Sequence, residues 1–204
     1  SSIEPTTVPE LLFQYMSDAQ HKLVPFFHLP LQSGSDIILH KMKRRYSSKE
    51  YTEEISRVFE SVPDLCIGTD VMVGFPEENE VEFKSTLRLL EKLPLAYFHV
   101  FPFSARKGTS AFRNNEQIPS QVKFKRGEIL RSLSIKKRRE FYMRFLGQCR
   151  NVLWESKKLD GTVSGYTDNY IRVVTDELYS SDLRNQLLSV RLTELRGQTM
   201  LGKS

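Results

Sequence analysis

Cysteine is scarce in this sequence, because only Cys66 and Cys149 occur among 204 residues, and they lie far apart. They form no CxxC pair, and they exclude a disulfide-stapled secreted scaffold. Cys66 falls in an apolar stretch, where a thiol behaves as a small hydrophobic side chain. Any metal ligands must come from elsewhere, and the sequence predicts no metal site.

Long apolar runs and low-complexity segments are also missing. No stretch approaches the roughly 20 apolar residues that span a bilayer, and no charged-then-apolar leader opens the sequence. Ten Gly and nine Pro are an ordinary share for a globular protein. These absences predict a soluble, cytoplasmic protein without a membrane partner.

Familiar catalytic patterns are absent as well. No Ser/His/Asp or Cys/His set is legible, no Walker loop occurs, and no GxGxxG follows a predicted strand. The sequence therefore assigns no catalytic residue by pattern alone.

The first two thirds of the sequence alternate strands with helices. Apolar, β-branched stretches predict strands over residues 24–31, 65–75 and 95–103. Helices are predicted between them, with capping boxes at Thr7/Glu10 and Ser47/Glu50 and an Asn79 cap. Alternation of this kind predicts an α/β fold with a parallel sheet.

A long helix over residues 120–146, stopped by Gly147, separates this part from a different pattern. Short strands are predicted over residues 150–155, 162–166, 170–175, 187–195 and near Met200, with Trp154 in their core. Such spacing is typical of a small β-barrel. We therefore expect two domains, residues 1–146 and 147–204.

Positive charge is concentrated in the long helix. Residues 121–150 hold ten Lys/Arg against two Glu, a local balance of +8 in a protein of net charge +5. Such a block attracts polyanions whatever their sequence, although a solvated helix face is an equal alternative on composition alone.

Candidate ligand-binding loops follow the three predicted strands, at residues 32–35, 74–77 and 104–109. Asp70 lies inside an apolar strand and therefore needs a partner or a ligand. His28 is interpreted as a hydrogen-bonded core histidine. Tyr97, His99, Phe101 and Phe103 alternate onto one face and are interpreted as core.

Four ordered segments together resemble one family. They are residues 28–36 (HLPLQSGSD), 42–46 (MKRRY), 69–77 (TDVMVGFPE) and 103–109 (FSARKGT). This set resembles the radical S-adenosylmethionine (SAM) methylthiotransferases, which modify a tRNA adenosine next to the anticodon or a ribosomal protein. The start of the chain is similar to the branch that acts on N6-threonylcarbamoyladenosine. The tail from about Gly147 resembles the TRAM domain, an OB-like RNA-binding β-barrel.

The resemblance implies a partial (β/α) radical-SAM-type barrel, its C-terminal half, followed by the TRAM barrel. It implies SAM and two 4Fe–4S clusters as cofactors and the tRNA anticodon region as partner. The implied SAM or substrate contacts are Gln32, Ser33, Asp70, Gly74, Phe75 and Arg106. The RNA contacts expected from the basic helix and the barrel are Lys136, Lys137, Arg138, Arg139, Arg144, Tyr166, Asn169 and Tyr170.

The sequence departs from the family because no CxxxCxxC segment is present. We therefore expect a chain that begins in mid-domain, lacks the cluster ligands and is inactive alone, with self-association through an exposed sheet edge. The alternatives are a non-catalytic RNA-binding module, the isopentenyladenosine or ribosomal-protein branch, and an unrelated phosphate-binding β/α enzyme.

Overall fold

The computed structural model describes residues 4–5, 8–18, 20–114, 116–157, 161–175 and 183–203, without the side chains of residues 156 and 157. The elements before the barrel are α1 (Leu11–Ser17), β1 (Phe26–His28), α2 (Asp36–Lys41), α3 (Ser48–Ser61), β2 (Cys66–Val73), α4 (Glu80–Lys92), β3 (Tyr97–Pro102), α5 (Ser110–Arg113) and α6 (Ser120–Met143). The barrel strands are β4 (Cys149–Lys157), β5 (Val163–Thr167), β6 (Arg172–Thr175), β7 (Leu187–Arg196) and β8 (Thr199–Lys203). Among the described residues, no helix is long and apolar enough to cross a membrane.

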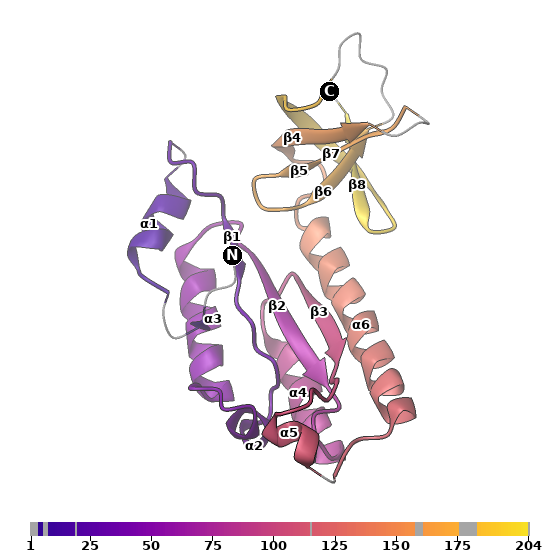
Figure 1. Ribbon diagram of the computed structural model, residues 1–204. Coiled ribbons are helices and arrows are strands. Elements are labelled where there is room, and N and C mark those ends of the chain that lie inside the picture. Colours follow the sequence, from indigo (N-terminus) through magenta and orange to yellow (C-terminus); the bar gives the residue numbers. More distant parts are fainter. Residues whose placement is uncertain are drawn as a thin grey trace.

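The first part is a parallel three-stranded sheet in the order β1-β2-β3. Because side chains alternate along a strand, the sheet has two faces. One face buries Phe27, Ile67, Val71 and Phe98 in an apolar core that also contains residues of α3, α4 and α6. Figure 1 shows these helices beside the strands, and the α/β prediction is confirmed.

The second part is a closed barrel with strand order β4-β5-β6-β8-β7. Trp154 is fully buried in it, as predicted. Gly165 permits the closure, because a Cβ there would lie 2.2 Å from the carbonyl oxygen of Leu153 on the neighbouring strand.

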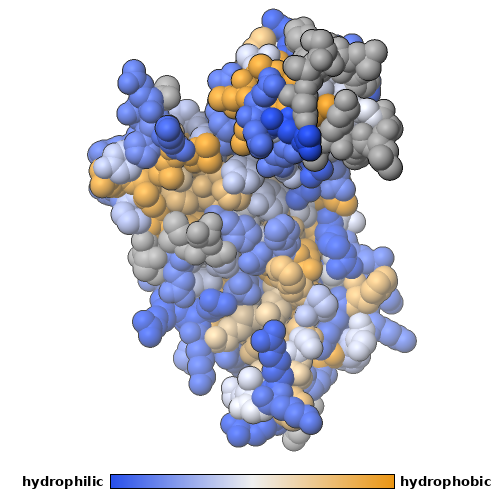
Figure 2. Space-filling model, turned by 45° about the horizontal axis from the view of Figure 1, so that its top comes forward, coloured by the Kyte–Doolittle hydropathy of each residue, from blue (hydrophilic) through white to orange (hydrophobic). Residues whose placement is uncertain are grey.

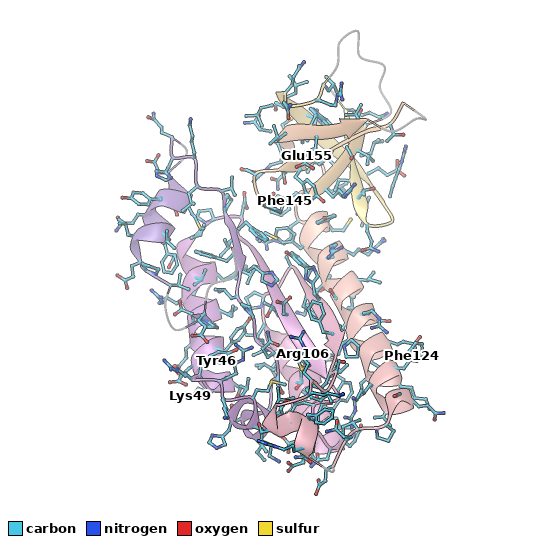
Figure 3. The ribbon with its side chains drawn as sticks, viewed as in Figure 1. Tyr46, Lys49, Arg106, Phe124, Phe145 and Glu155 are labelled. Atoms are coloured by element: carbon cyan, nitrogen blue, oxygen red, sulfur yellow. The ribbon has the colours of Figure 1, made fainter. Side chains whose placement is uncertain are left out.

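Helix α6 leads from the sheet to the barrel, and an apolar cluster covers the junction. It contains Cys66 and Ala96 from the sheet side, Phe141 and Phe145 from the chain around the end of α6, and Trp154 from the barrel. Figure 3 places Phe145 where the helix meets the barrel. The arrowheads of β2 and β3 point away from the barrel, so the barrel lies near their amino ends (Figure 1).

Two predicted helix ends differ from the structure. Helix α6 ends at Met143, and Gly147, although its φ is +83°, donates its N–H to the carbonyl oxygen of Leu192 in β7 and so caps no helix. Helix α1 begins after Glu10, which makes no side-chain cap, while the proposed partner Thr7 lies outside the described residues. The capping box of Ser47 and Glu50 is confirmed.

Candidate functional site

The face of the sheet opposite the helices is lined by polar and aromatic side chains. His28, Asp70, Tyr97, His99 and Phe101 lie on it, each on the same side of its strand. The interpretation of these aromatics as core is wrong for His99 and Phe101, which are exposed, whereas Tyr97 and Phe103 are half-buried and Tyr97 packs against an apolar cluster. The alternation of side chains along the strand correctly places these residues on one face, but the helices cover the opposite face of the sheet.

Asp70 has two histidine partners on this face. Its Oδ1 lies 3.1 Å from Nε2 of His28 and 3.4 Å from Nδ1 of His99. One residue comes from each of three adjacent strands, and Asp70 is directly opposite His99 in the register. The side chains of His28 and Asp70 are 13% and 22% exposed, so the carboxylate is partnered but remains open to solvent.

A buried hydroxyl network holds β1 in register where Pro30 cannot donate to the ladder. Thr69 Oγ1 donates to the carbonyl oxygen of Leu29 and accepts from the N–H of Leu31. The hydroxyl of Tyr51, on α3, also donates to the Leu29 carbonyl. Burial raises the pKa of Tyr51 and keeps this phenol protonated as a donor.

The loop after β1 is built for packing. Gln32 has φ +68° and exchanges two backbone hydrogen bonds of 2.8 Å with β2. Ser33 is fully buried, with its hydroxyl 3.2 Å from that of Thr86 in α4. A Cβ on Gly34 would lie 2.7 Å from Cα of Thr86, so this glycine permits close approach of the helix. The geometry makes Ser33 and Gly34 supports of the loop, while Gln32 is half-buried.

The loop after β2 rests on a buried ion pair. Gly74, at φ +74°, donates its N–H to Oε2 of Glu78, which also accepts from Arg126 at 2.8 Å. The contacts with Gly74 and Arg126 lower the pKa of Glu78, but burial has the larger effect and raises it. Phe75 packs edge-on against Phe103, with ring centroids 5.0 Å apart. Gly74 therefore shapes the loop, and Phe75 belongs to its apolar support.

Arg106 follows β3 and is exposed. Figure 3 shows it beside the sheet near the carboxyl ends of β2 and β3. Gln32 and Phe75 follow the carboxyl ends of β1 and β2, so the predicted SAM-side residues share this edge of the sheet.

A cleft of about 1180 Å³ separates the amino ends of the strands from the barrel. Its sheet side includes Tyr97 and His99, and its barrel side includes Tyr166, Tyr170 and Arg172. In Figure 2 apolar residues gather near α1 and on the barrel, with hydrophilic residues between them. Because His99 lines it, the cleft reaches the Asp70 cluster.

Cationic and aromatic groups converge in this cleft. The guanidinium of Arg138 lies 4.9 Å above the ring of Tyr97. Arg172 donates to the hydroxyl of Tyr166 at 2.8 Å and lies 5.5 Å from its ring centroid. Tyr170 is 46% exposed and stacks on Phe26, with centroids 4.0 Å apart. The cleft thus combines aromatic faces with charges of both signs, because Asp18, Asp64, Glu155 and Asp168 line it beside Lys22, Arg138, Arg150 and Arg172.

Two predicted RNA contacts are committed to the fold instead. Lys137 is 8% exposed, and its Nζ donates to the carbonyl oxygens of Glu91 and Leu93 at the end of α4. Burial lowers its pKa. Asn169 is fully buried, and its amide donates to the carbonyl oxygen of Asp64. Neither side chain is free to meet a polyanion.

The remaining predicted cations are accessible. Lys136, Arg139 and Arg144 are exposed, with Lys136 3.9 Å from Glu140 and Arg144 5.7 Å from the ring of Phe59. The basic block of the sequence is therefore part surface charge and part structural support.

The cysteines do not fit an iron–sulfur cluster, which thiolates hold. Burial raises the pKa of the Cys66 thiol to about 12, and Cys149 is exposed at the start of the barrel. Two thiols in separate parts of the molecule cannot supply a ligand set.

Two residues of the site, His99 and Arg172, are not among the site residues that the sequence predicts. The alternation of Tyr97, His99 and Phe101 is the available signal for His99, because it places them on one face of the strand, but only the register shows that Asp70 lies opposite His99. Arg172 had no such signal, since only barrel closure places it beside Tyr166.

Comparisons with known proteins agree with the earlier resemblance. Over residues 2–90 the sequence matches the radical SAM superfamily. It is 40% identical to the threonylcarbamoyladenosine tRNA methylthiotransferase MtaB of Aquifex aeolicus over 156 residues, 76% of this chain and 37% of the relative. It is 34% identical to MtaB of Chlamydia pneumoniae, over all of this chain and 48% of the relative. The chain is thus related along its whole length to radical SAM methylthiotransferases.

A relative from a second branch matches at a similar level. The tRNA-2-methylthio-N(6)-dimethylallyladenosine synthase of Wolbachia pipientis wMel is 35% identical over 92% of this chain and 43% of the relative. The chain thus spans less than half the length of these relatives. The family uses SAM and 4Fe–4S clusters.

The fold has a solved counterpart. The coproporphyrinogen III oxidase HemN of Escherichia coli, a radical SAM enzyme, superposes with a TM-score of 0.54 at 12% identity, over 67% of this chain and 31% of HemN. This likeness supports a partial radical-SAM-type α/β domain.

Proposed function

We propose that this chain is the substrate-facing part of a tRNA methylthiotransferase that adds a methylthio group to C2 of N6-threonylcarbamoyladenosine next to the anticodon. The observation that carries the proposal is the cleft. It joins a barrel surface with Tyr166, Tyr170 and Arg172 to the open sheet face that holds Asp70 and His99. Aromatic rings and guanidinium planes are the groups on which unstacked RNA bases rest.

The barrel, residues 147–204, is assigned to RNA binding as a TRAM domain, and residues 1–146 to the catalytic barrel. Phosphates would meet Arg138, Arg139 and Arg172, while bases would meet Tyr166 and Tyr170. Lys137 and Asn169 are removed from the RNA contacts because their polar groups hold the fold together.

SAM is proposed to lie against the open sheet face near the carboxyl ends of the strands. Its sulfonium and ammonium groups suit the solvent-open carboxylate of Asp70, and Gln32 and Arg106 offer further polar contacts at that edge. SAM supplies the radical and the methyl group when bound with the clusters. Because the cysteines do not fit a cluster, the isolated chain is expected to be inactive.

The RNA assignment is tested by fluorescence anisotropy with an anticodon stem-loop RNA at several salt concentrations. Arg138→Gln with Arg172→Gln removes two cleft cations, and the salt slope should fall by up to about two because each lost phosphate contact removes about 0.7–0.9. Lys49→Gln is the control, because Lys49 is exposed on α3, away from the cleft (Figure 3). Equal slopes for the double variant and the control would refute the assignment.

The branch is tested with three stem-loops that differ only at the target base. A preference for threonylcarbamoyladenosine over dimethylallyladenosine and plain adenosine supports the proposed substrate. A preference for dimethylallyladenosine would favour the branch to which the Wolbachia relative belongs by name, and equal affinities would refute recognition of the base modification by this chain.

The second candidate is an RNA-binding module without chemistry, which Tyr166, Tyr170 and Arg172 of the barrel alone would support. Calorimetry with SAM separates the two, since RNA binding without SAM binding favours the module.

Self-association through the sheet edge stays a prediction. The edge strand β1 has three residues and lies between Pro25 and Pro30, which limits pairing with another chain.

A further inference from the structure

The sheet face carries a cluster that neither the sequence patterns nor the family comparison assigns to a metal ion, although Asp70 is also among the proposed SAM contacts. His28, Asp70 and His99 each offer one ligand atom, and the three atoms lie within 4.8 Å of one another. They come from three adjacent strands of a sheet whose other face is packed against helices, so their backbones are fixed. We propose that these three side chains form a binding site for Zn²⁺ or a similar late first-row divalent cation.

The spacing matches the proposed cation. A tetrahedral ion with bonds of about 2.0–2.1 Å holds its ligand atoms about 3.3 Å apart. The two imidazole nitrogens lie 3.1 and 3.4 Å from the same Asp70 oxygen. All three ligand atoms lie within 4.8 Å of one another, so side-chain rotations can bring them to one ion.

The donor set selects the class of cation. Two imidazoles and one carboxylate favour Zn²⁺, Cu²⁺, Ni²⁺ or Co²⁺ over Mg²⁺ and Ca²⁺, which prefer oxygen ligands. With neutral imidazoles the three ligands carry one negative charge, which attracts a divalent cation to an otherwise basic molecule.

The surroundings leave one side of the site open. The side chain of His99 is 54% exposed and lines the cleft. Its ring lies 5.3 Å from that of Tyr97 and 6.3 Å from that of Phe101, which limit its rotation. Three protein ligands with an open side leave a coordination position for water or for a donor atom of a molecule in the cleft.

Tyr97 can lie beside this cluster because Gly68 has no side chain. A Cβ on Gly68 would lie 2.6 Å from the Tyr97 ring, and Gly68 pairs with His28 on one side and Tyr97 on the other. The same ring lies 6.5 Å from that of His28. The aromatic wall of the site is thus part of the sheet register.

The test is calorimetry with Zn²⁺, using Cys149→Ser as the parent so that the exposed thiol contributes nothing. One ion per chain is expected, with no competition from excess Mg²⁺. His99→Gln and Asp70→Ala should each weaken binding at least tenfold. His40→Gln is the matched control, because His40 is exposed on α2 outside the cluster and should bind Zn²⁺ like the parent.

A second readout separates a lost ligand from a lost fold. Zn²⁺ should raise the thermal midpoint of the parent and of His40→Gln but not that of His99→Gln, because an ion stabilises only a fold that binds it. His99 is half-exposed, so this variant should keep the parent's far-UV circular dichroism. Absence of binding to the parent, or unchanged affinity in folded His99→Gln, would overturn the proposal. Both readouts are taken without RNA or SAM, so their failure is distinguishable from a failure of the proposed function, which also uses Asp70.

Discussion

Glu78 and Arg126 form a buried ion pair beneath the loop that follows β2. Their side chains are 1% and 8% exposed, and Arg126 donates both to the Glu78 carboxylate and to its backbone carbonyl oxygen. Among the described residues, Glu78 Oε1 and Arg126 Nε have no hydrogen-bond partner. A pair of this kind stabilises the fold only while both partners are present, because either charge alone stays buried and uncompensated.

Removing one partner should therefore be severe. Arg126→Met is expected to lower the free energy of unfolding by about 3–5 kcal/mol, measured by urea denaturation. Arg131→Met, on the same helix but exposed, is the control and should change it by less than about 0.5 kcal/mol. An Arg126→Met protein as stable as the control would mean that the pair contributes nothing.

Glu77, in the same loop, gives the fold a pH dependence. Its carboxylate accepts from Lys41 and from the amide of Asn114, and these hydrogen bonds lower its pKa. A carboxyl whose folded pKa lies below its unfolded value stabilises the fold fully above the unfolded value, and this stabilisation is lost as the pH falls through the folded pKa.

Glu77→Gln should accordingly have a lower thermal midpoint than the parent at a pH of about 6, and the difference should shrink at a pH of about 3. Glu50, whose pKa is also lowered, titrates equally in both proteins, so it cancels in the comparison. A difference that stays constant with pH would assign the effect to packing.

The sequence predicts single residues best where a physical cost must be met locally. Asp70 inside an apolar strand demands a partner, and Trp154 demands a core, and the structure provides both. The sequence wrongly predicts His99 in the core. Alternation shows which residues share a face, but which face the helices cover depends on contacts distant in sequence. The sequence predicts Lys137 and Asn169 as RNA contacts because it does not reveal their carbonyl partners, Leu93 and Asp64, which belong to other parts of the chain.

At the scale of elements, α6 closes the open edge of β3. Ser134 Oγ accepts from the N–H of Phe98 at 2.9 Å and donates to its carbonyl oxygen at 2.7 Å. An edge strand otherwise presents such groups to water or to another chain. A single hydroxyl thus substitutes for a neighbouring strand at this point.

Ser134→Ala should lower the free energy of unfolding by about 1–3 kcal/mol, because it leaves a buried donor and acceptor without a partner. Chemical denaturation measures the loss. Ser132→Ala is the matched control, since Ser132 is exposed on the same helix and alanine is the better helix former. If both variants behave alike, the hydroxyl does not seal the edge.

Predictions of elements succeed where the signal is local. The caps at Ser47 and Asn79 begin α3 and α4 as expected, because side chain and backbone lie within three residues. The end of α6 was misplaced, because Gly147 pairs with Leu192 from β7, a contact 45 positions away in sequence. The strand predicted over residues 24–31 is longer than β1, because Pro30 interrupts the backbone ladder. The side chain of Thr69, which is distant in sequence, accepts from Leu31 in its place.

At the scale of the whole molecule, the junction between sheet and barrel is both apolar and charged. Arg150, on β4, donates to Asp64 before β2 at 2.7 Å and to Asp168 in the barrel at 2.8 Å. The amide of Asn169 reaches the backbone of the same Asp64. The apolar cluster around Phe145 continues beneath these contacts. The cleft therefore lies between two bodies that are fastened together at one end.

Unfolding should reveal this coupling, because the two parts have separate reporters. The only tryptophan, Trp154, is buried in the barrel, while the long helices that dominate far-UV circular dichroism precede it. In the unmodified chain, tryptophan fluorescence and circular dichroism should change together during urea denaturation, since one apolar cluster belongs to both parts.

Arg150→Met should separate the two unfolding curves, because charged hydrogen bonds that hold the barrel to the sheet are lost. The fluorescence transition should be destabilised by about 1–3 kcal/mol, and the circular dichroism transition should shift less. Arg172→Met removes a guanidinium whose described side-chain contacts stay within the barrel, so its two curves should remain together. Coincident curves for Arg150→Met would show that the apolar cluster alone holds the barrel against the sheet.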